Sequence, residues 1–415
     1  MKSLFENYKS TIILLGSILL GGIVGAYMGP KAAIFQPVGD LFLNFLFMIL
    51  VPLVFFSVTS AISNMGEMKR LGKILKNIVI VFTITSVIAA IVGMIGVLLF
   101  NPTKGLNPEM FRDIIASASS EGQEKVSLAQ QLVNTVTVTD FKDLLSKSNM
   151  LQLIIMSMLF GVATAMAGEK ARPIANFVQA GSEVMMKIVS LIMKFAPIGL
   201  GCYFAAVIGD LGPQILSGYA RVFVLYLILT VVYYFGFYTL YAYIAGGKDG
   251  IKIFWSQVVP PTVTALATCS SAASIPVNMD ASKKMNVPED IAETVIPLGA
   301  NVHKDGSVIG GILKVTFLFG LFGQDMTSIS AILGILAVAF LVGAVMGAIP
   351  GGGLMGEMLI ISVYGFSPEV LPIIAVISTI IDAPATVLNS TTNTVCSMLV
   401  ARLVEGKEWL KKQIQ

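Results

Sequence analysis

Charged side chains are scarce in this sequence. Asp, Glu, Lys and Arg make up only 12% of its 415 residues, about half the share found in ordinary globular proteins. Apolar residues make up 55% and the mean hydropathy is +0.84, so there is too little polar surface to cover a water-soluble particle of this size. The net charge of +3 is too small to attract a nucleic acid. The composition excludes a soluble enzyme, a disordered chain and a nucleic-acid-binding module, and it predicts an integral membrane protein.

Cysteine and histidine are also rare. The three cysteines lie far apart in apolar stretches, which argues against a disulfide framework or a zinc site and fits small buried thiols. His303 is the only histidine. The sequence also lacks the H-E-x-x-H, G-x-S-x-G and phosphate-loop motifs. We therefore expect neither an enzyme activity nor an organic cofactor.

Long apolar runs fill the first 250 residues. A bilayer core needs about 20 apolar residues per helix, and six runs satisfy this length. The run at 11–28 is too long for the core of a signal peptide and is interpreted as the first span. The polar stretch 101–149 is predicted to be a surface loop without a core. The six predicted spans are 11–30, 40–63, 77–100, 150–167, 183–209 and 217–245.

Basic residues in the short loops predict the orientation, because such residues concentrate on the cytoplasmic side. They follow the second, fourth and sixth spans, so both termini are expected in the cytoplasm. The residues are Lys69, Arg70, Lys73, Lys76, Lys170, Arg172, Lys248 and Lys252.

After about residue 250 the apolar runs are interrupted by small, polar and proline residues. A helix that faces lipid cannot carry such breaks, since each backbone amide freed in hydrocarbon costs several kcal/mol. Irregular backbone at this depth is expected only where protein, water or a solute covers it, so the breaks point to the binding site of a transporter. The predicted breaks are Pro260–Pro261, Thr268–Pro276, Asn301–Gly306, Pro350–Gly353 and Asp382–Asn393.

Two of these breaks are similar to each other. Ser270–Pro276 and Gly347–Gly353 both place small residues around a proline, between apolar arms that are short for a full span. Each is followed by a longer segment with its own polar break. The order hairpin, broken helix, hairpin, polar helix predicts an internal repeat of roughly 100 residues. Two ordinary kinked helices are the alternative.

Motifs from the second span to the last helix resemble one known family. Val51–Ser57 is similar to a proline-centred signature of the dicarboxylate/amino acid:cation symporters, which include the glutamate transporters. Ser270–Met279 is most similar to the serine-rich tip of the bacterial serine/threonine symporter. The resemblance runs from about residue 12 to residue 404. Further matches are Pro297–Ala300, Asp305–Ser307, Ile349–Gly351 and, at a spacing of about one turn, Asp382, Thr386, Asn389 and Asn393.

The resemblance implies an all-α membrane protein with eight transmembrane helices and two re-entrant hairpins, related as inverted repeats. It also implies a homotrimer in the inner cell membrane. Residues 1–76 and 150–210 are expected to form a scaffold, and 77–100 and 211–415 a transport domain that moves like an elevator, with 101–149 as an extracytoplasmic loop. The hairpin tips at 268–276 and 346–353 are expected to act as gates.

The resemblance also implies a substrate site on the broken segments. Asp382 matches the acid that receives the amino group of the substrate. Family members that carry glutamate or aspartate have an arginine at the position of Ala385, and some have another at the position of Cys269. An acidic side chain would therefore lose its cationic partner here, and we expect a small neutral amino acid (serine, threonine or alanine). The expected substrate-binding residues are Ser270, Ser271, Ser307, Ala348, Ile349, Gly351, Asp382, Ala385, Thr386 and Asn389.

The expected cation site departs from the family pattern. Asp305 matches a sodium-binding aspartate, and the hydroxyls of Thr85 and Ser86 are kept. The eighth-helix aspartate of the family is Asn393 here, and an asparagine is His303, which makes proton coupling an alternative to the favoured sodium coupling. The expected cation ligands are Thr85, Ser86, Gly299, Asn301, His303, Asp305, Asn389 and Asn393.

Lys304 replaces a methionine whose sulfur lies beside a bound sodium in the family, and Phe82 replaces a tyrosine nearby. Two unit positive charges about 4 Å apart repel by roughly 4 kcal/mol at an effective dielectric constant of 20. An inward Lys304 is therefore expected to keep that sodium site empty and to act as a tethered cation. Pairing with Asp305 or extension to the lipid headgroups is the alternative. Residues without an assigned role, expected at the surface or between domains, are Lys187, Lys194, Lys314 and Glu357.

A channel is the competing function class, because channels also use re-entrant segments. Saturable uptake and counterflow exchange distinguish a transporter from a channel. The partners expected from the sequence are a small amino acid, the lipid bilayer and two further copies of the chain.

Overall fold

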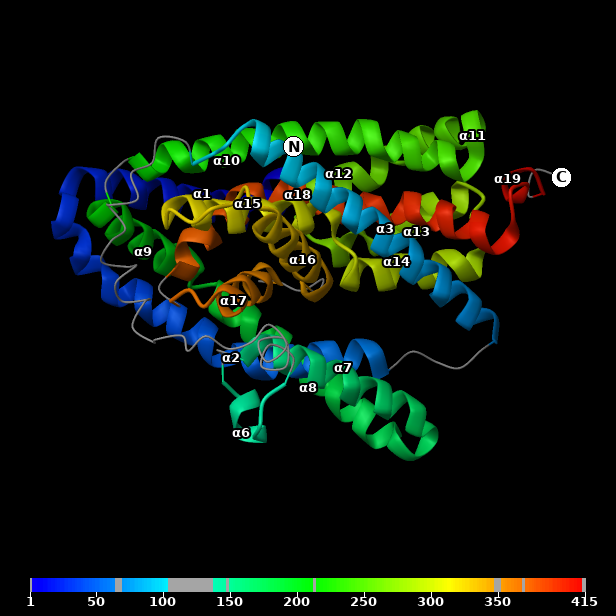
Figure 1. Cartoon of the computed structure of the whole chain (residues 1–415), viewed down its shortest axis with the longest axis horizontal. Helices are drawn as coiled ribbons and strands as arrows, with labels where there is room; N and C mark the ends of the chain where they lie inside the picture. The colour runs from blue at the N-terminus through cyan, green and yellow to red at the C-terminus, as the bar shows by residue number, and fades with distance from the viewer. Residues whose placement is uncertain are drawn as a thin grey trace.

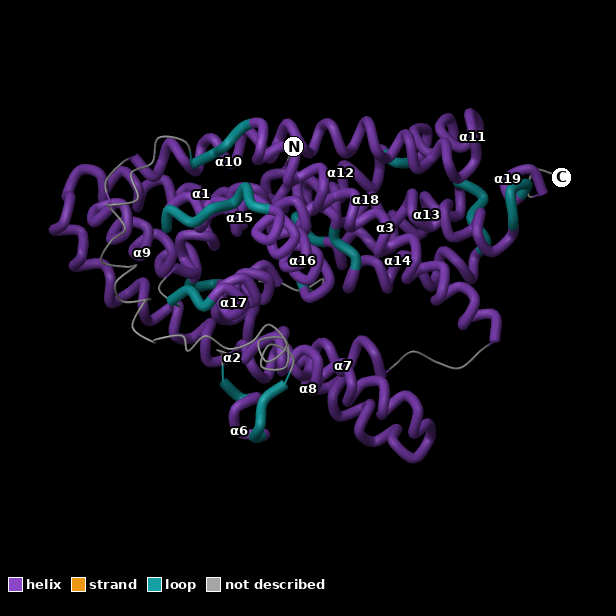
Figure 2. The backbone as a smooth tube through the Cα atoms, viewed as in Figure 1, coloured by secondary structure: helices purple, strands orange, loops and turns teal. Residues whose placement is uncertain are grey.

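The structure, a computed structural model, describes residues 2–63, 69–103, 137–146, 149–211, 214–346, 352–367 and 370–412. These residues form helices and loops, and no strand occurs among them (Figure 2). The predicted all-helical class is therefore confirmed. Four stretches within them are long and apolar enough to cross a membrane: Gly16–Phe42, Lys73–Leu99, Leu216–Gln257 and Ile373–Glu405.

Five of the six apolar runs in the first 250 residues are helical where predicted. The sixth run contains one π-helical turn, η5 (Val232–Phe237), in which the helix is locally widened. The helices are α1 (Lys2–Met28), α2 (Gln36–Ser63), α3 (Lys69–Leu99), α7 (Met150–Ala167), α10 (Gln214–Val231) and α11 (Tyr238–Gln257). Short 3-10 helices, η1 (Gly29–Phe35) and η4 (Gly168–Ala171), follow α1 and α7.

The fifth predicted span, 183–209, is not one continuous helix, and this prediction was wrong. Helix α8 (Arg172–Met193) ends and α9 (Ala196–Leu211) begins with a turn between them. Pro197 explains the interruption, because proline has no N–H for the helical hydrogen bond and its ring collides with the carbonyl four residues earlier. The apolar composition of the run concealed this local effect.

Helices α1, α2, α7, α8 and α9 pack mainly against one another and are called the glycine-packed group below. Helices α1 and α9 approach very closely. A Cβ atom added at Gly21 would lie 2.2 Å from the carbonyl oxygen of Gly201, and one added at Gly25 would lie 2.3 Å from that of Ala205. Small residues four positions apart share one helix face, and this pattern is typical of close helix contacts in membranes.

The remaining long helices, α3 and α10 to α18, form a second group that is called the polar-core group. Figure 1 places α10 and α11 along one edge of the molecule and α7 and α8 along the other, with α15 and α16 between. The bounds are α12 (Val259–Thr268), α13 (Ser271–Lys284), α14 (Glu289–Val302), α15 (Asp305–Leu321), α16 (Ile329–Val345), α17 (Gly352–Tyr364) and α18 (Leu371–Glu405), followed by the short α19 (Trp409–Lys412).

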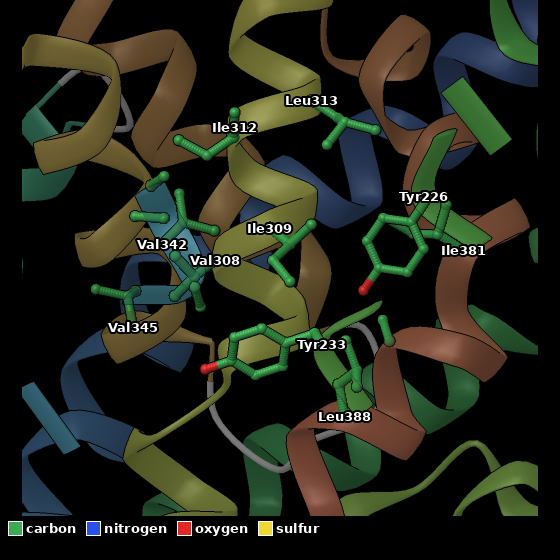
Figure 3. Close-up of a cluster of buried hydrophobic side chains, with 14 of the residues drawn as sticks. Tyr226, Tyr233, Val308, Ile309, Ile312, Leu313, Val342, Val345, Ile381 and Leu388 are labelled. Atoms are coloured by element: carbon green, nitrogen blue, oxygen red, sulfur yellow. The ribbon is translucent and has the colours of Figure 1, made fainter. Parts of the chain in front are cut away.

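Helix α15 is the centre of the polar-core group. Nearly all of its side chains are buried, and it contacts α3, α16 and α18. Figure 3 shows Ile309 and Leu313 of α15 beside Tyr226, Tyr233 and Ile381 from neighbouring elements. This apolar packing holds the N-terminus of α15, where the polar residues gather, in a fixed position.

Two predicted breaks are interruptions of the helical backbone. Cys269 adopts a left-handed conformation (φ 47°) and, with Ser270, separates α12 from α13. His303 and Lys304 are extended and separate α14 from α15. The predicted break at Pro260 and Pro261 falls beside a helix boundary: α11 ends at Gln257, and the prolines lie in the first turn of α12, where a missing N–H is tolerated.

The predicted break at 382–393 was wrong. Helix α18 is continuous through this stretch, with Pro384 inside it. Polar side chains here hydrogen-bond to the backbone of the same helix: Thr391 donates to the carbonyl of Val387 at 2.6 Å, and Asn393 donates to that of Asn389 at 2.8 Å. These bonds satisfy the side chains without opening the helix.

Two predicted features lie largely outside the described residues. Most of the polar stretch 101–149 does so, apart from a segment that contains the single helical turn α6 (Phe141–Leu144). The tip of the second predicted hairpin, 347–351, also lies outside, and it includes the predicted substrate ligands Ala348, Ile349 and Gly351.

Candidate functional site

The break between α14 and α15 brings three consecutive ionisable side chains into the interior. His303, Lys304 and Asp305 are 1%, 4% and 0% exposed. The extended backbone at the first two residues (φ −131° and −142°) lets α15 begin at Asp305. Because buried charges are costly unless they are paired, the partners of these side chains decide what the site can do.

Asp305 is surrounded by four hydrogen-bond donors. Its Oδ1 accepts from the Ser86 hydroxyl and lies near His303 Nε2, both at 3.1 Å. Its Oδ2 accepts from the Tyr233 and Thr392 hydroxyls, both at 2.9 Å. Donors from α3, η5, the helix break and α18 therefore converge on this carboxylate.

The contacts of His303 fit an imidazolium ion. Its Nδ1 lies 2.9 Å from Asn393 Oδ1, and the amide nitrogen of Asn393 donates to a backbone carbonyl, so the oxygen faces the ring. Its Nε2 lies 2.8 Å from Thr85 Oγ1 and 3.1 Å from the Asp305 carboxylate. Both nitrogens thus face acceptors, which favours a proton on each. Phe82 stacks on the ring at a centroid distance of 4.1 Å, an arrangement that suits a cation.

Most of the predicted cation ligands lie together around this histidine. Gly299 packs against Asn393 so closely that an added Cβ would lie 2.1 Å from its Oδ1. Asn301 is one exception, because its side chain is exposed and donates to the carbonyl of Pro297 at 3.0 Å. Asn389 is the other, because its side chain bonds Ser307 and its backbone carbonyl accepts from Asn393. The residues brought together are Thr85, Ser86, Gly299, His303, Asp305 and Asn393.

Sequence reasoning missed two ligands of Asp305. Tyr233 lies in an aromatic run that looks like ordinary membrane-facing sequence, and only the widened turn η5 directs its hydroxyl to the carboxylate. Thr392 lies within a stretch that was interpreted as a backbone break. The one available signal for Thr392 was its position directly before Asn393, on a helix rich in polar residues.

The turn between α12 and α13 presents hydroxyl groups to the same region. Ser270 caps α13, because its Oγ accepts from the Ala273 N–H at 3.2 Å. Ser271, the first residue of α13, is buried, and its Oγ lies 3.4 Å from Lys304 Nζ. Two of the predicted substrate residues therefore lie beside the helix break.

Helix α18 contributes four more of the predicted substrate residues, and α15 contributes Ser307. Asn389 and Ser307 bond each other twice: the Ser307 N–H donates to Asn389 Oδ1, and Asn389 Nδ2 donates to Ser307 Oγ, both at 2.9 Å. Ala385 and Thr386 are buried, whereas Asp382 is exposed and interacts with the Thr386 hydroxyl. Unlike Asp305, the Asp382 carboxylate is therefore accessible to a solute.

The expectation that Glu357 and Lys314 lie at the surface or between domains was wrong, because they pair within the polar-core group. Both are buried, at 1% and 2% exposure, and Lys314 Nζ lies 3.3 Å from Glu357 Oε1. Ser378 of α18 also donates to Oε1, whereas Oε2 has no partner among the described residues. Opposite charges on α15 and α17 pair across the core, which a single sequence does not reveal. Lys187 and Lys194 are exposed, as expected.

A cavity of about 710 Å³ lies elsewhere, between the C-terminal end of α3 and α10. Most of its lining is apolar, and none of its lining residues belongs to the candidate site. They are Leu99, Phe100, Asn101, Ala220, Arg221, Val224, Leu225 and Ile228.

Known proteins resemble this chain over nearly its whole length. The model of the Sodium:dicarboxylate symporter family matches residues 11–403. A proton/sodium-glutamate symport protein of Bacillus caldotenax is 30% identical over 93% of this chain and 92% of the relative. A protein of the same description from Bacillus subtilis (strain 168) is 27% identical, covering 95% and 92%. The C4-dicarboxylate transport protein of that strain is 26% identical, covering 96% and 94%.

Proposed function

The chain belongs to the Sodium:dicarboxylate symporter family, and we propose that it is a cation-coupled symporter of a small neutral amino acid such as serine, threonine or alanine. The observation that carries the proposal is the pair Asp382 and Ala385 on α18. Asp382 offers an exposed carboxylate to an amino group, and Ala385 offers no cation to a second carboxylate one turn away. Members of the family are transporters rather than enzymes.

The arginines support a neutral substrate. Arg172 pairs with Glu169, and Arg402 donates to the carbonyl of Ile244. Arg221 lines the cavity between α3 and α10. These contacts all lie outside the candidate site. The named relatives carry glutamate or C4-dicarboxylates by their descriptions, so acidic solutes are the rival substrates in the experiment below.

The helix lengths support two re-entrant hairpins within an eight-span fold. Helices α12 and α13 have 10 and 14 residues, or about 15 and 21 Å at 1.5 Å per residue. Both are shorter than the bilayer core of about 30 Å. Helices α16 and α17, with 17 and 13 residues, are also short. We assign them to the second hairpin, whose gating tip is residues 346–353.

The packing of the helices supports a division into a scaffold and a moving part. We propose that the glycine-packed group forms the scaffold expected at 1–76 and 150–210, and the polar-core group the transport domain expected at 77–100 and 211–415. Residues 69–76 join the second group, because they belong to α3. Contacts within each group outnumber those between the groups. We propose an elevator movement of the second group in a homotrimer of the inner cell membrane, with both termini in the cytoplasm.

Sodium is the first candidate for the coupling ion. Asp305, Thr85 and Ser86 supply the oxygen atoms that a sodium site requires. The proton is the second candidate, and the position of His303 favours it. The imidazole lies against both Thr85 and Asp305, where a protonated ring and a sodium ion would repel each other. Binding of the two ions at this point is therefore mutually exclusive.

Uptake into proteoliposomes tests the proposal. Radiolabelled serine, threonine, alanine, glutamate, aspartate and succinate are supplied under an imposed sodium gradient, an imposed proton gradient or neither. Saturable uptake and counterflow of a neutral amino acid, accelerated by one of the gradients, is the expected result. Preferential uptake of the acidic solutes would contradict the substrate assignment, and flux without saturation or counterflow would indicate a channel.

Asp382→Asn is the matching variant for the uptake experiment. Loss of a hydrogen-bonded charge costs about 1.5–3 kcal/mol, so uptake at low substrate concentration should fall roughly 10- to 100-fold. Asp280→Asn is the control, because Asp280 is an exposed acid that pairs with Lys284 at 2.7 Å. The control should transport like the unaltered protein.

A further inference from the structure

Lys304 has a buried amino group that forms no ion pair among the described residues. Its side chain is 4% exposed, and no carboxylate among the described residues forms an ion pair with it. Within the described part of the chain, its hydrogen-bond partner is Ser271 Oγ, at the long distance of 3.4 Å. An ammonium group has three protons to donate, so the residues that the structure describes here supply fewer acceptors than such a buried cation requires.

Two alternative roles for Lys304, an ion pair with Asp305 and extension to the lipid headgroups, do not fit this geometry. Asp305, its neighbour in sequence, is already bonded to four other donors, and Lys304 is not among them. Extension to the lipid headgroups would expose the ammonium, whereas Nζ lies against the first residue of α13. The side chain therefore extends into the candidate substrate site.

Lys304 also acts electrostatically on Asp382, which lies on α18. The other cation that acts on Asp382 is Lys314, and it is paired with Glu357. One carboxylate and one ammonium thus remain for a solute. The N-terminus of α13, whose first N–H groups are unsatisfied by the helix itself, adds positive potential on the side of Lys304.

We propose that Lys304 Nζ and Ser271 Oγ bind the carboxylate of the transported amino acid, while Asp382 binds its ammonium group. This inference rests on the proposed function and deepens it by naming the residue that recognises the acid group. The arrangement selects zwitterions, because each end of the solute meets the opposite charge. A dicarboxylate without an amino group would place its second carboxylate near Asp382 and be repelled.

Binding of L-serine and of L-serine methyl ester tests the proposal, because the ester keeps the amine and loses the negative charge. Affinities are measured by thermal stabilisation and calorimetry in sodium and in choline. The unaltered protein should prefer L-serine to the ester by about 10- to 100-fold. In Lys304→Met the preference should fall to within about threefold, and Lys304→Arg should retain most of it.

Control variants separate recognition from structure. Lys284→Met removes an exposed lysine of α13 and should keep the preference for serine. Ser271→Ala should lower the preference less than Lys304→Met does, and it serves as a second test if Lys304→Met fails to fold. A structural role of Lys304 would lower both affinities in proportion and leave their ratio unchanged.

The outcomes are distinct. An unchanged ratio in Lys304→Met overturns the inference but leaves the proposed function intact. Tight binding of serine by Lys304→Met in sodium alone also overturns it, because the ammonium then replaces a sodium ion rather than binding the acid. Failure of the unaltered protein to bind serine, threonine or alanine would overturn the proposed function itself.

Discussion

The helices of the glycine-packed group and those of the polar-core group are held together by different kinds of contact. In the first, the buried polar residues that the structure describes are Thr59, Ser157 and Thr164, and each donates to a backbone carbonyl. In the second, buried side chains include ionisable groups that bond one another across four or more helices. The first group is held by contact of surfaces, and the second by specific polar partners.

The difference fits a structural role for the first group and a binding role for the second. Close glycine contacts need no desolvated charge, so they provide cohesion at little electrostatic cost. A buried polar network stabilises the fold only when each of its groups has a hydrogen-bond partner. Loss of one partner leaves a buried polar group unpaired, which destabilises the protein. We expect substitutions in the two groups to differ accordingly, and the following predictions test that expectation.

The largest effect is expected at the buried pair of Lys314 and Glu357. Glu357→Gln leaves the lysine without its counter-charge, and breaking such a pair costs about 3–5 kcal/mol. The double variant Lys314→Met/Glu357→Leu should be nearly neutral, because it removes both charges. The unfolding temperatures of the single and the double variant in detergent are the measurement. Equal destabilisation by the single and the double variant would show that packing volume, not charge, holds α17.

The next effect compares two buried serines. Ser86→Ala removes one of the four donors to Asp305, and a hydrogen bond to a charged group contributes about 1.5–3 kcal/mol. Ser157→Ala, in the glycine-packed group, removes a neutral bond to the carbonyl of Leu153 and should cost about 1 kcal/mol. The difference in unfolding temperature is the measurement. A larger fall in unfolding temperature for Ser157→Ala than for Ser86→Ala would contradict the proposed difference between the two groups.

A third prediction concerns the contact between α1 and α9. Gly21→Ala and Gly25→Ala each place a methyl group within 2.3 Å of a carbonyl oxygen, and overpacking of this kind costs about 1–3 kcal/mol. Gly16→Ala is the control on the same helix, since nothing lies within 4 Å of its added Cβ. Unfolding of the three variants should separate them. An unchanged unfolding temperature in Gly21→Ala would contradict the close contact of α1 with α9.

The smallest effect is expected at the exposed loop between α15 and α16. Hydrogen bonds from Thr327 and Ser328 lower the pKa of Asp325 from 3.8 to about 2. Because the folded pKa is the lower one, the stabilisation is present above pH 3.8 and is lost as the pH falls through about 2. Asp325→Asn should therefore unfold slightly earlier than the unaltered protein at pH 7, and the difference should vanish near pH 2. A constant difference across this range would exclude the carboxylate as its cause.

Sequence patterns predicted the helices well where composition alone decides. The run at 150–167 corresponds to α7 residue for residue. The break at His303 and Lys304 was also predicted, because polar residues inside an apolar run are tolerated only where something covers them. Composition failed at Pro197, where a single residue interrupts an otherwise uniform run.

Tertiary partners account for the parts of the site that the sequence did not reveal. The stretch 382–393 looks like a break in sequence, but its hydroxyls and amides bond their own helix and its neighbours. The pairing of Lys314 with Glu357 joins residues 43 positions apart, so no pattern in the local sequence predicts it. Tyr233 likewise becomes a ligand of Asp305 only through the fold.

The π-helical turn η5 has a consequence for the register of the helix that contains it. One extra residue in a turn rotates everything beyond it by about 100° relative to a regular α-helix. If the same residues wound as a regular α-helix, the whole of α11 would turn about its axis and carry a different set of side chains towards α18. Deleting one residue within Val232–Phe237 would instead let the turn close as an α-turn, with α11 keeping its orientation and Tyr233 losing its place. The aromatic hydroxyl that reaches Asp305 depends on this single irregularity, so the spacing of the chain here is as constrained as the identity of the tyrosine.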